Sequence, residues 1–292
     1  MPLPPSFQTE GFVSGATIRP RMLLRSGKKL KPLMLGTEGE TNTGKSEFLL
    51  SAPGPGIIIP MDRGFDGMLD NPNPPKERRQ GDFAWLPMQV PLNTTATQAE
   101  YGKYFAMFRD GFYKALANKD ALTVCIDGDS DSWELQRLAE FGKLANVWPQ
   151  TKYGDAYAHR RAMIAKAWDS GKIIIATNKI RDEYVKALDD KGMPIKEADG
   201  TDKKEKSGRK ERQGFPDQDY LWQVQIRHMY KPAHKRKMGE RMIDVPQNWG
   251  LVILKCKPNP GLIGSELWGA DCNFKGLVQH ILPEVPLTDW GF

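Results

Sequence analysis

Short runs of consecutive apolar and β-branched residues recur along the first part of the chain, each bounded by glycine, proline or polar residues. Runs of this kind are typical of strands that are buried on both faces of a parallel sheet. Four of them are predicted as core strands, and residues 83–86 form a fifth candidate. The four runs are residues 33–35, 57–59, 122–126 and 173–177.

Between these runs, apolar residues recur with helical spacing. Three phenylalanines within residues 98–118 are three and four positions apart, which predicts a helix with an aromatic stripe packed in the core. A capping-box pattern predicts a second helix over about 131–146, and a third is expected over 155–169. Alternating strands and helices predict an α/β fold with a mostly parallel central sheet flanked by helices.

The pattern changes after about residue 181. Residues 196–212 hold seven basic and five acidic residues and no large apolar one, which is typical of a mobile loop. Residues 222–226 alternate like a strand and residues 251–254 resemble a buried one, so antiparallel strands are expected toward the C-terminus. Between these two strands, residues 227–241 carry six basic residues and one acidic residue, a net charge of 6 − 1 = +5.

These patterns divide the chain into an arm and one domain. Residues 1–30 are polar, with a basic stretch near their end, and are expected to form an N-terminal arm. Residues 31–292 are expected to form a single domain. Within it, we expect a mobile basic loop at about 190–215 and a C-terminal extension at about 258–292.

Composition narrows the class of protein. The 292 residues are 39% hydrophobic and 27% charged, which fits a globular protein, and the net charge of +6 suits a polyanionic partner. The three cysteines are too few and too scattered for a disulfide framework or a zinc site. No stretch approaches the ~18 apolar residues of a membrane span, and the N-terminus lacks a signal-peptide pattern. We therefore expect a cytoplasmic protein with reduced thiols and no membrane partner.

One motif carries specific chemistry. Between the first predicted strand and a predicted helix, the chain follows the phosphate-binding loop pattern G-x-x-x-x-G-K-[S/T]. Glycines let such a loop wrap a triphosphate with backbone N–H groups, the lysine reaches the β- and γ-phosphates, and the serine hydroxyl ligates Mg²⁺. ATP and Mg²⁺ are therefore the expected cofactors. The loop residues are Gly39, Glu40, Thr41, Asn42, Thr43, Gly44, Lys45 and Ser46.

A phosphate loop also needs a carboxylate that holds Mg²⁺ through water. Asp127 directly follows the run at 122–126, and we expect it to end a strand that neighbours the loop. Asp129 is the alternative if that strand runs further. Helix capping is nevertheless the favoured role for both Asp129 and Asp131.

Polar residues that follow two other predicted strands are further candidates. Asp62 lies just past the run at 57–59 and could orient the attacking water, because ligands gather at the carboxyl edge of such sheets. A turn or a salt bridge to Arg63 is its alternative role. Asn178 and Lys179 follow the strand that ends near residue 177 and could sense the γ-phosphate, with ordinary strand-end polarity as the alternative. The four histidines show no metal-ligand spacing, so we expect them to be structural or to contact phosphate.

In this order, the phosphate loop, Asp62, Asp127 and the segment 177–181 resemble the RecA-type ATPase core. They are most similar to small phage-encoded AAA-type nucleotide-binding proteins linked to single-strand annealing and recombination. The resemblance implies a catalytic acidic residue at Asp62, a Mg²⁺-associated aspartate at Asp127, and a polar switch at 177–181 that leads into a DNA-binding loop. It also implies that Lys255 and Lys257 reach the nucleotide of a neighbouring subunit, with a solvated strand edge as the alternative. Strand alternation would place both lysines on one face.

The resemblance covers about residues 30–282 and departs from the RecA type at three positions. Asp62 is shorter than the usual glutamate, Lys179 stands where glutamine is common, and Gly128 stands where serine is common. The implied function is a DNA-stimulated, homo-oligomeric ATPase with nucleotide at the subunit interface. It would act on single-stranded DNA in phage recombination or replication in the host cytoplasm, beside a single-strand annealing or single-strand-binding protein. Two alternatives stay open: an ATP-binding assembly or scaffold protein with a protein partner, and a small-molecule kinase.

Overall fold

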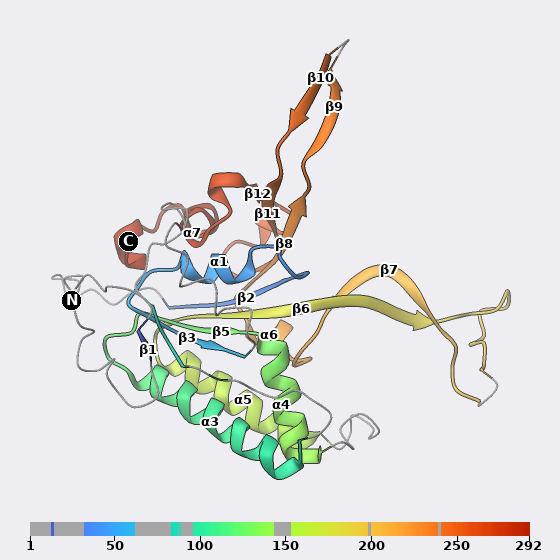
Figure 1. The fold of residues 1–292 in the computed structure, drawn as a ribbon, viewed down its shortest axis with the longest axis horizontal. Coiled ribbons are helices and arrows are strands. Elements are labelled where there is room, and N and C mark those ends of the chain that lie inside the picture. Colours follow the sequence, from blue (N-terminus) through green and yellow to red (C-terminus); the bar gives the residue numbers. More distant parts are fainter. Residues whose placement is uncertain are drawn as a thin grey trace.

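The computed structural model describes residues 13–14, 32–61, 83–86, 88, 96–142, 153–197, 200–238 and 241–292. At its centre is a large sheet whose middle strands run parallel in the order β4-β3-β5-β6-β2-β8 (Figure 1). These strands are β2 (Leu33–Gly39), β3 (Gly56–Pro60), β4 (Phe83–Trp85), β5 (Thr123–Asp127), β6 (Ile173–Lys186) and β8 (Val224–Lys231).

Antiparallel strands complete the sheet at its two edges. At one edge, β1 (Val13–Ser14) pairs with β4. At the other, β11 (Asn248–Cys256) pairs with β8, and β12 (Glu266–Trp268) pairs with β11. The predicted strands are therefore present, and the expectation of antiparallel strands toward the C-terminus is confirmed.

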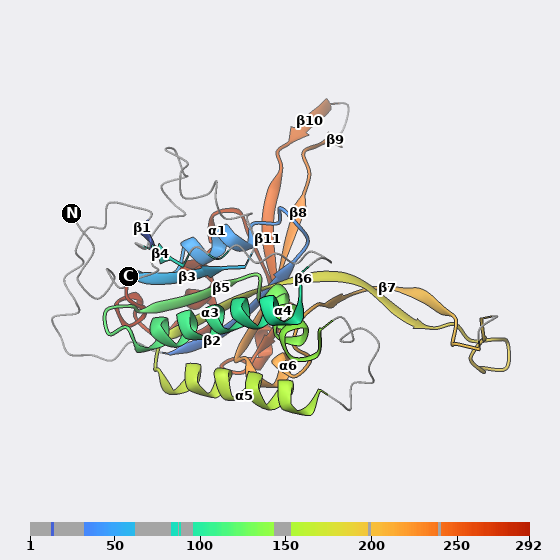
Figure 2. The same ribbon diagram turned by 60° about the horizontal axis from the view of Figure 1, so that its bottom comes forward.

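Helices cover both faces of the sheet (Figures 1 and 2). One hydrophobic cluster joins the sheet to α3 (Gln98–Ala117), α4 (Asp129–Phe141) and α5 (Gly154–Asp169), and it contains the buried phenylalanine stripe of α3. The opposite cluster joins the sheet to α1 (Lys45–Leu50) and α7 (Phe274–Ile281). The expected α/β class, a mostly parallel sheet between helices, is confirmed. Within the described residues, no helix combines the length and the apolar character needed to cross a bilayer.

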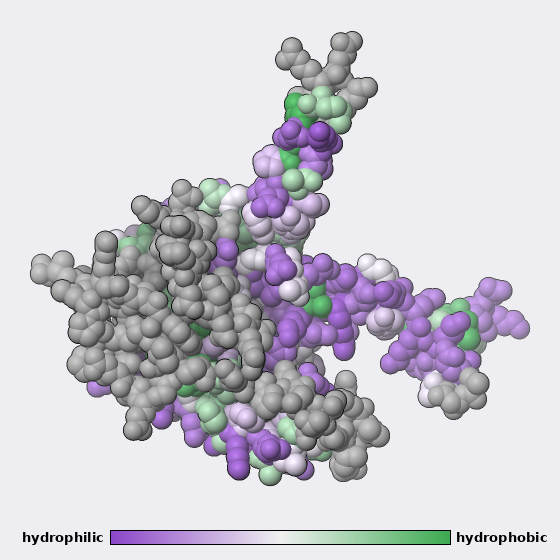
Figure 3. Space-filling view, viewed as in Figure 1, coloured by the Kyte–Doolittle hydropathy of each residue, from purple (hydrophilic) through white to green (hydrophobic). Residues whose placement is uncertain are grey.

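The second half of β6 leaves the body of the sheet and pairs with β7 (Lys204–Arg212) in a projecting hairpin, here called the first arm (Figure 1). Residues 204–212, which were expected to lie in a mobile loop, instead form a strand. Opposite charges explain the pairing, because Asp182 forms ion pairs across the arm with Lys206 at 2.6 Å and Lys210 at 2.8 Å. Such cross-strand pairs stabilise a ladder without an apolar face. The visible surface of this arm is mostly hydrophilic (Figure 3).

A second arm continues from β8 and β11. It consists of β9 (His234–Met238) and β10 (Arg241–Val245), which pair antiparallel with Val245 opposite His234. The basic stretch expected between two strands is thus itself part of a hairpin that rises away from the sheet (Figures 1 and 3).

The C-terminal part of the chain packs on the face that carries α1. After the short helical turns at Pro260–Leu262 and Gly269–Asp271, α7 buries its apolar side beside α1, with the rings of Phe48 and Phe274 6.2 Å apart. A last turn, Leu287–Trp290, places the fully buried Trp290 against Phe274. This packing fixes α1, and with it the end of the phosphate loop.

Candidate functional site

The phosphate loop links β2 to α1, as the motif predicts. A Cβ atom at Gly39 would lie 2.6 Å from Oγ1 of Thr43 and 3.1 Å from Cβ of His228, so only glycine fits there. Asn42 and Gly44 adopt left-handed backbone conformations, with φ of 63° and 91°. The hydroxyl of Thr43 donates to the carbonyl of Glu40 at 2.8 Å and closes the turn. The sequence of the loop is therefore fitted to a tight, glycine-dependent curve.

Lys45 lies folded across this curve. Its ammonium group donates to the carbonyl oxygens of Gly39 at 2.9 Å and Glu40 at 2.5 Å. The positive charge is thus held at the loop itself by two neutral acceptors. An anion in the loop would offer this ammonium group a stronger, charge-assisted hydrogen bond.

Asp127 meets the loop through Ser46, a residue 81 positions away in sequence. The Ser46 hydroxyl donates to Oδ2 of Asp127 at 2.7 Å, and the Thr177 hydroxyl donates to Oδ1 at 2.7 Å. The Gly128 amide in turn donates to the Thr177 oxygen at 2.7 Å. Both oxygens of the buried carboxylate are therefore positioned by hydrogen bonds.

The strand order differs from the expectation for this carboxylate. Asp127 ends β5, and β6 lies between β5 and β2, so its strand does not neighbour the strand of the loop. The same order places β3, the strand before Asp62, three positions from β2. Asp127 still reaches Ser46 because parallel strands end at one edge of the sheet, where the side chains converge. Asp62 itself lies outside the described residues.

Helix capping, the role favoured for Asp129 and Asp131, is wrong. Gly128 precedes α4 and no side chain caps this helix end. Asp129 is instead buried, where it forms an ion pair with Arg160 and accepts a hydrogen bond from Gln218 at 2.5 Å. Asp131 forms an ion pair with Lys179 at 2.7 Å. Long-range partners on α5, α6 (Gln218–Leu221) and β6 thus override the local capping pattern.

Asn178 and Lys179 lie inside β6, which continues to Lys186 and does not end near residue 177 as expected, but they are level with the carboxyl end of β2. They pair in register with Glu38 and Gly39, so they are level with the start of the loop. The Asn178 side chain is 1% exposed, and within the described residues its amide nitrogen has no hydrogen-bond partner. The Lys179 ammonium contacts both oxygens of Asp131. Their roles toward a γ-phosphate stay predictions.

Lys255 and Lys257 lie away from the loop of their own chain. Lys255 is opposite Gln225, and Gln225 is opposite Gly36, so Lys255 is level with the middle of β2 and is separated from it by β8. Their ammonium groups donate to the backbone carbonyls of α6 residues Asp219 and Tyr220, the latter at 3.1 Å. Burial, and then the neighbouring Lys257, lower the pKa of Lys255. The two lysines share one face and Cys256 is buried, as strand alternation predicts.

An ion pair next to the loop was not predicted from the sequence. Glu38, the residue before Gly39, is only 5% exposed. The Nε and Nη2 atoms of Arg227 on β8 lie 2.6 and 2.5 Å from its Oε1, and Nε of Arg212, at the base of the first arm, lies 3.9 Å from Oε2. The sequence offered one sign of this pair, because Glu38 is the charged residue of the buried strand β2. The pair joins the loop strand to both arms.

His228 was also not singled out. Its ring is 3% exposed and lies edge-on to Phe48 of α1, with ring centroids 5.3 Å apart. Burial, and then the charge of Lys45, lower its pKa to about 3, so the imidazole is neutral near pH 7. A neutral histidine therefore lies directly behind the loop.

Comparisons with known proteins leave the family open. No protein-family model matches the chain, and no curated protein matches it. Among solved structures, a KaiC-like protein from the hyperthermophilic archaeon Pyrococcus horikoshii OT3 is similar, with a TM-score of 0.38 and 11% identity. The likeness covers 77% of this chain and 79% of that chain. Similarity at this level carries no argument about function, which therefore rests on the residues of the site.

Proposed function

We propose that this chain binds ATP with Mg²⁺ at the loop 39–46 and hydrolyses it. The observation that carries the proposal is the 2.7 Å hydrogen bond between Ser46 and Asp127. A hydroxyl and a carboxylate held together beside a phosphate loop offer the oxygen ligands that Mg²⁺ prefers. Within the described residues no cluster of three or more histidine, cysteine or acidic side chains could hold a metal. In the proposed site, phosphate oxygens and water would supply the remaining Mg²⁺ ligands.

The residues have distinct roles in this proposal. Bound Mg²⁺ supplies positive charge that stabilises the leaving phosphates. Lys45 exchanges its two carbonyl acceptors for phosphate oxygens, and the backbone of Gly39–Ser46 wraps the phosphates. Asp127 orients Ser46 and the water around the metal. Asp62 is proposed to orient the attacking water.

The test is the Mg²⁺ dependence of nucleotide affinity. Wild type should bind ATP more tightly with Mg²⁺ than with a chelator, and Ser46→Ala should lose most of this difference. For variants of the carboxylates Asp127 and Asp62, Asp110→Asn is the matched surface control. The interaction described for Asp110 is with its neighbour Arg109. An ATP affinity independent of both the metal and Ser46 would contradict the proposal.

We further propose that the protein is a homo-oligomer that acts on single-stranded DNA. The chain charge of +6 and the basic second arm support this partner. In the first arm, by contrast, acidic partners compensate several cations, among them Lys186, Lys196, Lys206 and Lys210. The second arm has four basic and two acidic residues over 234–245, and we propose it as the part of the chain that contacts phosphates. An ATP-binding scaffold protein is the alternative function, and it would bind oligonucleotides no better than a neutral protein does.

A further inference from the structure

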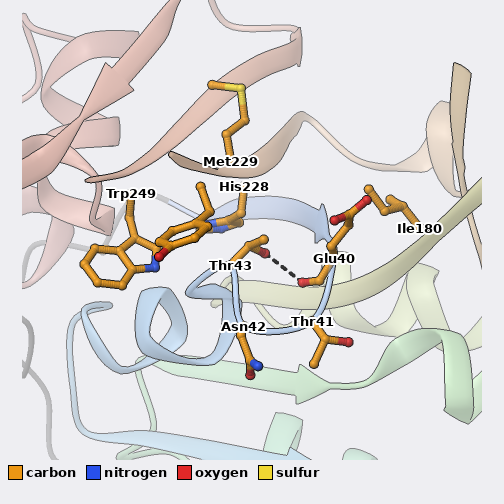
Figure 4. A pocket seen from close by; sticks show the side chains of 9 residues that line it. Glu40, Thr41, Asn42, Thr43, Ile180, His228, Met229 and Trp249 are labelled. Atoms are coloured by element: carbon orange, nitrogen blue, oxygen red, sulfur yellow. Dashed lines mark hydrogen bonds between the residues drawn. The ribbon is translucent and has the colours of Figure 1, made fainter. Parts of the chain in front are cut away.

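A hollow of about 650 Å³ adjoins the phosphate loop on the side of β8 and β11 (Figure 4). Loop residues Glu40–Thr43 form one wall, and the β8 and β11 side chains form the other. In Figure 4, Trp249 and Ile180 stand at opposite ends of this space. The hollow is therefore continuous with the loop but extends beyond the volume that phosphates alone would occupy.

Trp249 brings an aromatic surface to the edge of the loop. Its Cδ1 atom lies 3.7 Å from the position that a Cβ atom on Gly44 would occupy. Its ring centroid is 5.5 Å from that of Tyr230, which is opposite it in the β8–β11 ladder. Trp249 also lines a second, smaller hollow beside α1, together with Glu47 and Asn273. An aromatic ring thus lies next to the glycine that precedes Lys45, with the ring of Tyr230 beside it.

His228 gives an independent sign that this space receives a polar ligand. It lines both hollows, and neither of its ring nitrogens has a hydrogen-bond partner within the described residues. A neutral imidazole offers one donor and one acceptor. Leaving both buried and unpaired is unfavourable, so a ligand that supplies a partner gains affinity.

We propose that this hollow binds the purine base of the nucleotide, with the Trp249 indole stacked on the base and His228 offering it a hydrogen-bonding edge. The assignment rests on the proposed function, because the base arrives attached to a triphosphate that the loop must hold. Stacking on aromatic side chains is available to every base but follows the stacking strength of the ring system. Purine nucleotides should therefore bind more tightly than pyrimidine nucleotides.

The test compares ATP, CTP and inorganic tripolyphosphate as ligands of the full chain. Wild type should bind ATP more tightly than CTP, and CTP more tightly than tripolyphosphate. Trp249→Ala should weaken ATP binding about tenfold or more and leave tripolyphosphate binding unchanged, while Trp249→Phe should retain most of the affinity. Trp268→Ala on the neighbouring strand β12 is the control, because Trp268 does not line the hollow.

The possible failures are distinguishable. If wild type binds neither ATP nor tripolyphosphate, the proposed function is wrong and the base site falls with it. If both ligands bind but Trp249→Ala weakens them equally, or weakens only the binding of single-stranded DNA, the phosphate loop stands and the base assignment is overturned. If Trp249→Ala fails to fold, two other measurements can still overturn the base assignment. One is an equal affinity of wild type for ATP and CTP. The other is a Trp249→Leu variant that keeps its selectivity for ATP.

Discussion

At the scale of single residues, the site depends on one carboxylate with two fixed oxygens. Asp127 accepts hydrogen bonds from Ser46 and Thr177, so its position relative to the loop is set from both sides. An amide at this position keeps the shape but loses the charge that attracts the metal. In the proposed function, this side chain would therefore contribute to metal binding more than to packing.

We predict separable effects for the two candidate carboxylates. Asp127→Asn should weaken Mg²⁺-dependent ATP binding about 10- to 100-fold, as expected for a ligand that acts through metal-bound water. Asp62→Asn should leave binding intact and lower turnover about 10²- to 10⁴-fold, because it would remove the group that orients water. The measurements are ATP affinity and ATP turnover rate, made on both variants and on the control Asp110→Asn. Equal affinity losses in both, or normal turnover in the Asp62 variant, would contradict this division.

We predict that His228 makes the fold sensitive to acid. Its folded-state pKa of about 3 lies below the ordinary value of 6.5, so the unfolded chain binds the proton first. The stability that comes from keeping His228 neutral in the folded state is therefore present above pH 6.5. It is lost as the pH falls toward 3, at up to about 1.4 kcal/mol per pH unit. His228→Phe keeps an aromatic ring against Phe48 but does not titrate. Urea unfolding of both proteins between pH 7 and 4 should show a difference that changes with pH, and a constant difference would refute the prediction.

The sequence predicted the role of a site residue correctly where its partners lie close to it along the chain. The phosphate loop could be recognised because its chemistry lies within eight consecutive positions, from Gly39 to Ser46. Two partners of Asp129, Arg160 and Gln218, lie 31 and 89 positions away, and no local pattern indicates them. The Glu38–Arg227 pair spans 189 positions and was missed for the same reason.

At the scale of elements, the first arm is stabilised by paired charges. Lys206 and Lys210 donate to Asp182 and hold its pKa at about 2, so that carboxylate stays ionised under ordinary conditions. The charge-rich sequence of residues 204–212 predicted a loop because apolar residues do not recur in it at strand spacing. The strand β7 forms there because it pairs with β6. Apolar runs, by contrast, predicted the core strands correctly, because burial on both faces requires them.

We predict that cations of the second arm contribute more to DNA affinity than paired cations of the first. Replacing Lys235, Arg236 and Lys237 together by alanine should weaken oligonucleotide binding and lower the salt slope by about 2, at about 0.7 per phosphate contact. Lys206→Ala/Lys210→Ala is the matched comparison and should change the slope far less, because it removes charges already paired with Asp182. Titrations over a range of salt measure both. Identical slopes for wild type and the triple variant would rule out this role of the second arm.

At the scale of the whole molecule, we predict that neighbouring subunits share a nucleotide site. Lys255 and Lys257 face α6 rather than the loop of their own chain, so any contact with nucleotide must be made across an interface. The family resemblance suggested this role, and no pattern within one chain could establish it. Both ammonium groups contact α6 of their own chain, and their action on the nucleotide of a neighbouring subunit stays a prediction.

We predict that two inactive variants complement each other. Lys45→Ala subunits and Lys255→Ala/Lys257→Ala subunits should each lack ATPase activity. Mixed assemblies should recover part of it, because some interfaces pair an intact loop with intact lysines. Assemblies shown to contain both variants, yet without any activity, would argue against a shared site.

The most direct measurement of the central claim is ATP turnover by wild type and Lys45→Ala, with and without single-stranded DNA at a stated salt concentration. The Lys45 charge is held at the loop and should stabilise the transferring phosphate, so its removal should slow turnover by about 10²-fold or more. DNA should raise the wild-type rate and leave the variant inactive. Turnover by Lys45→Ala at the wild-type rate would contradict the assignment of the loop as an ATPase site.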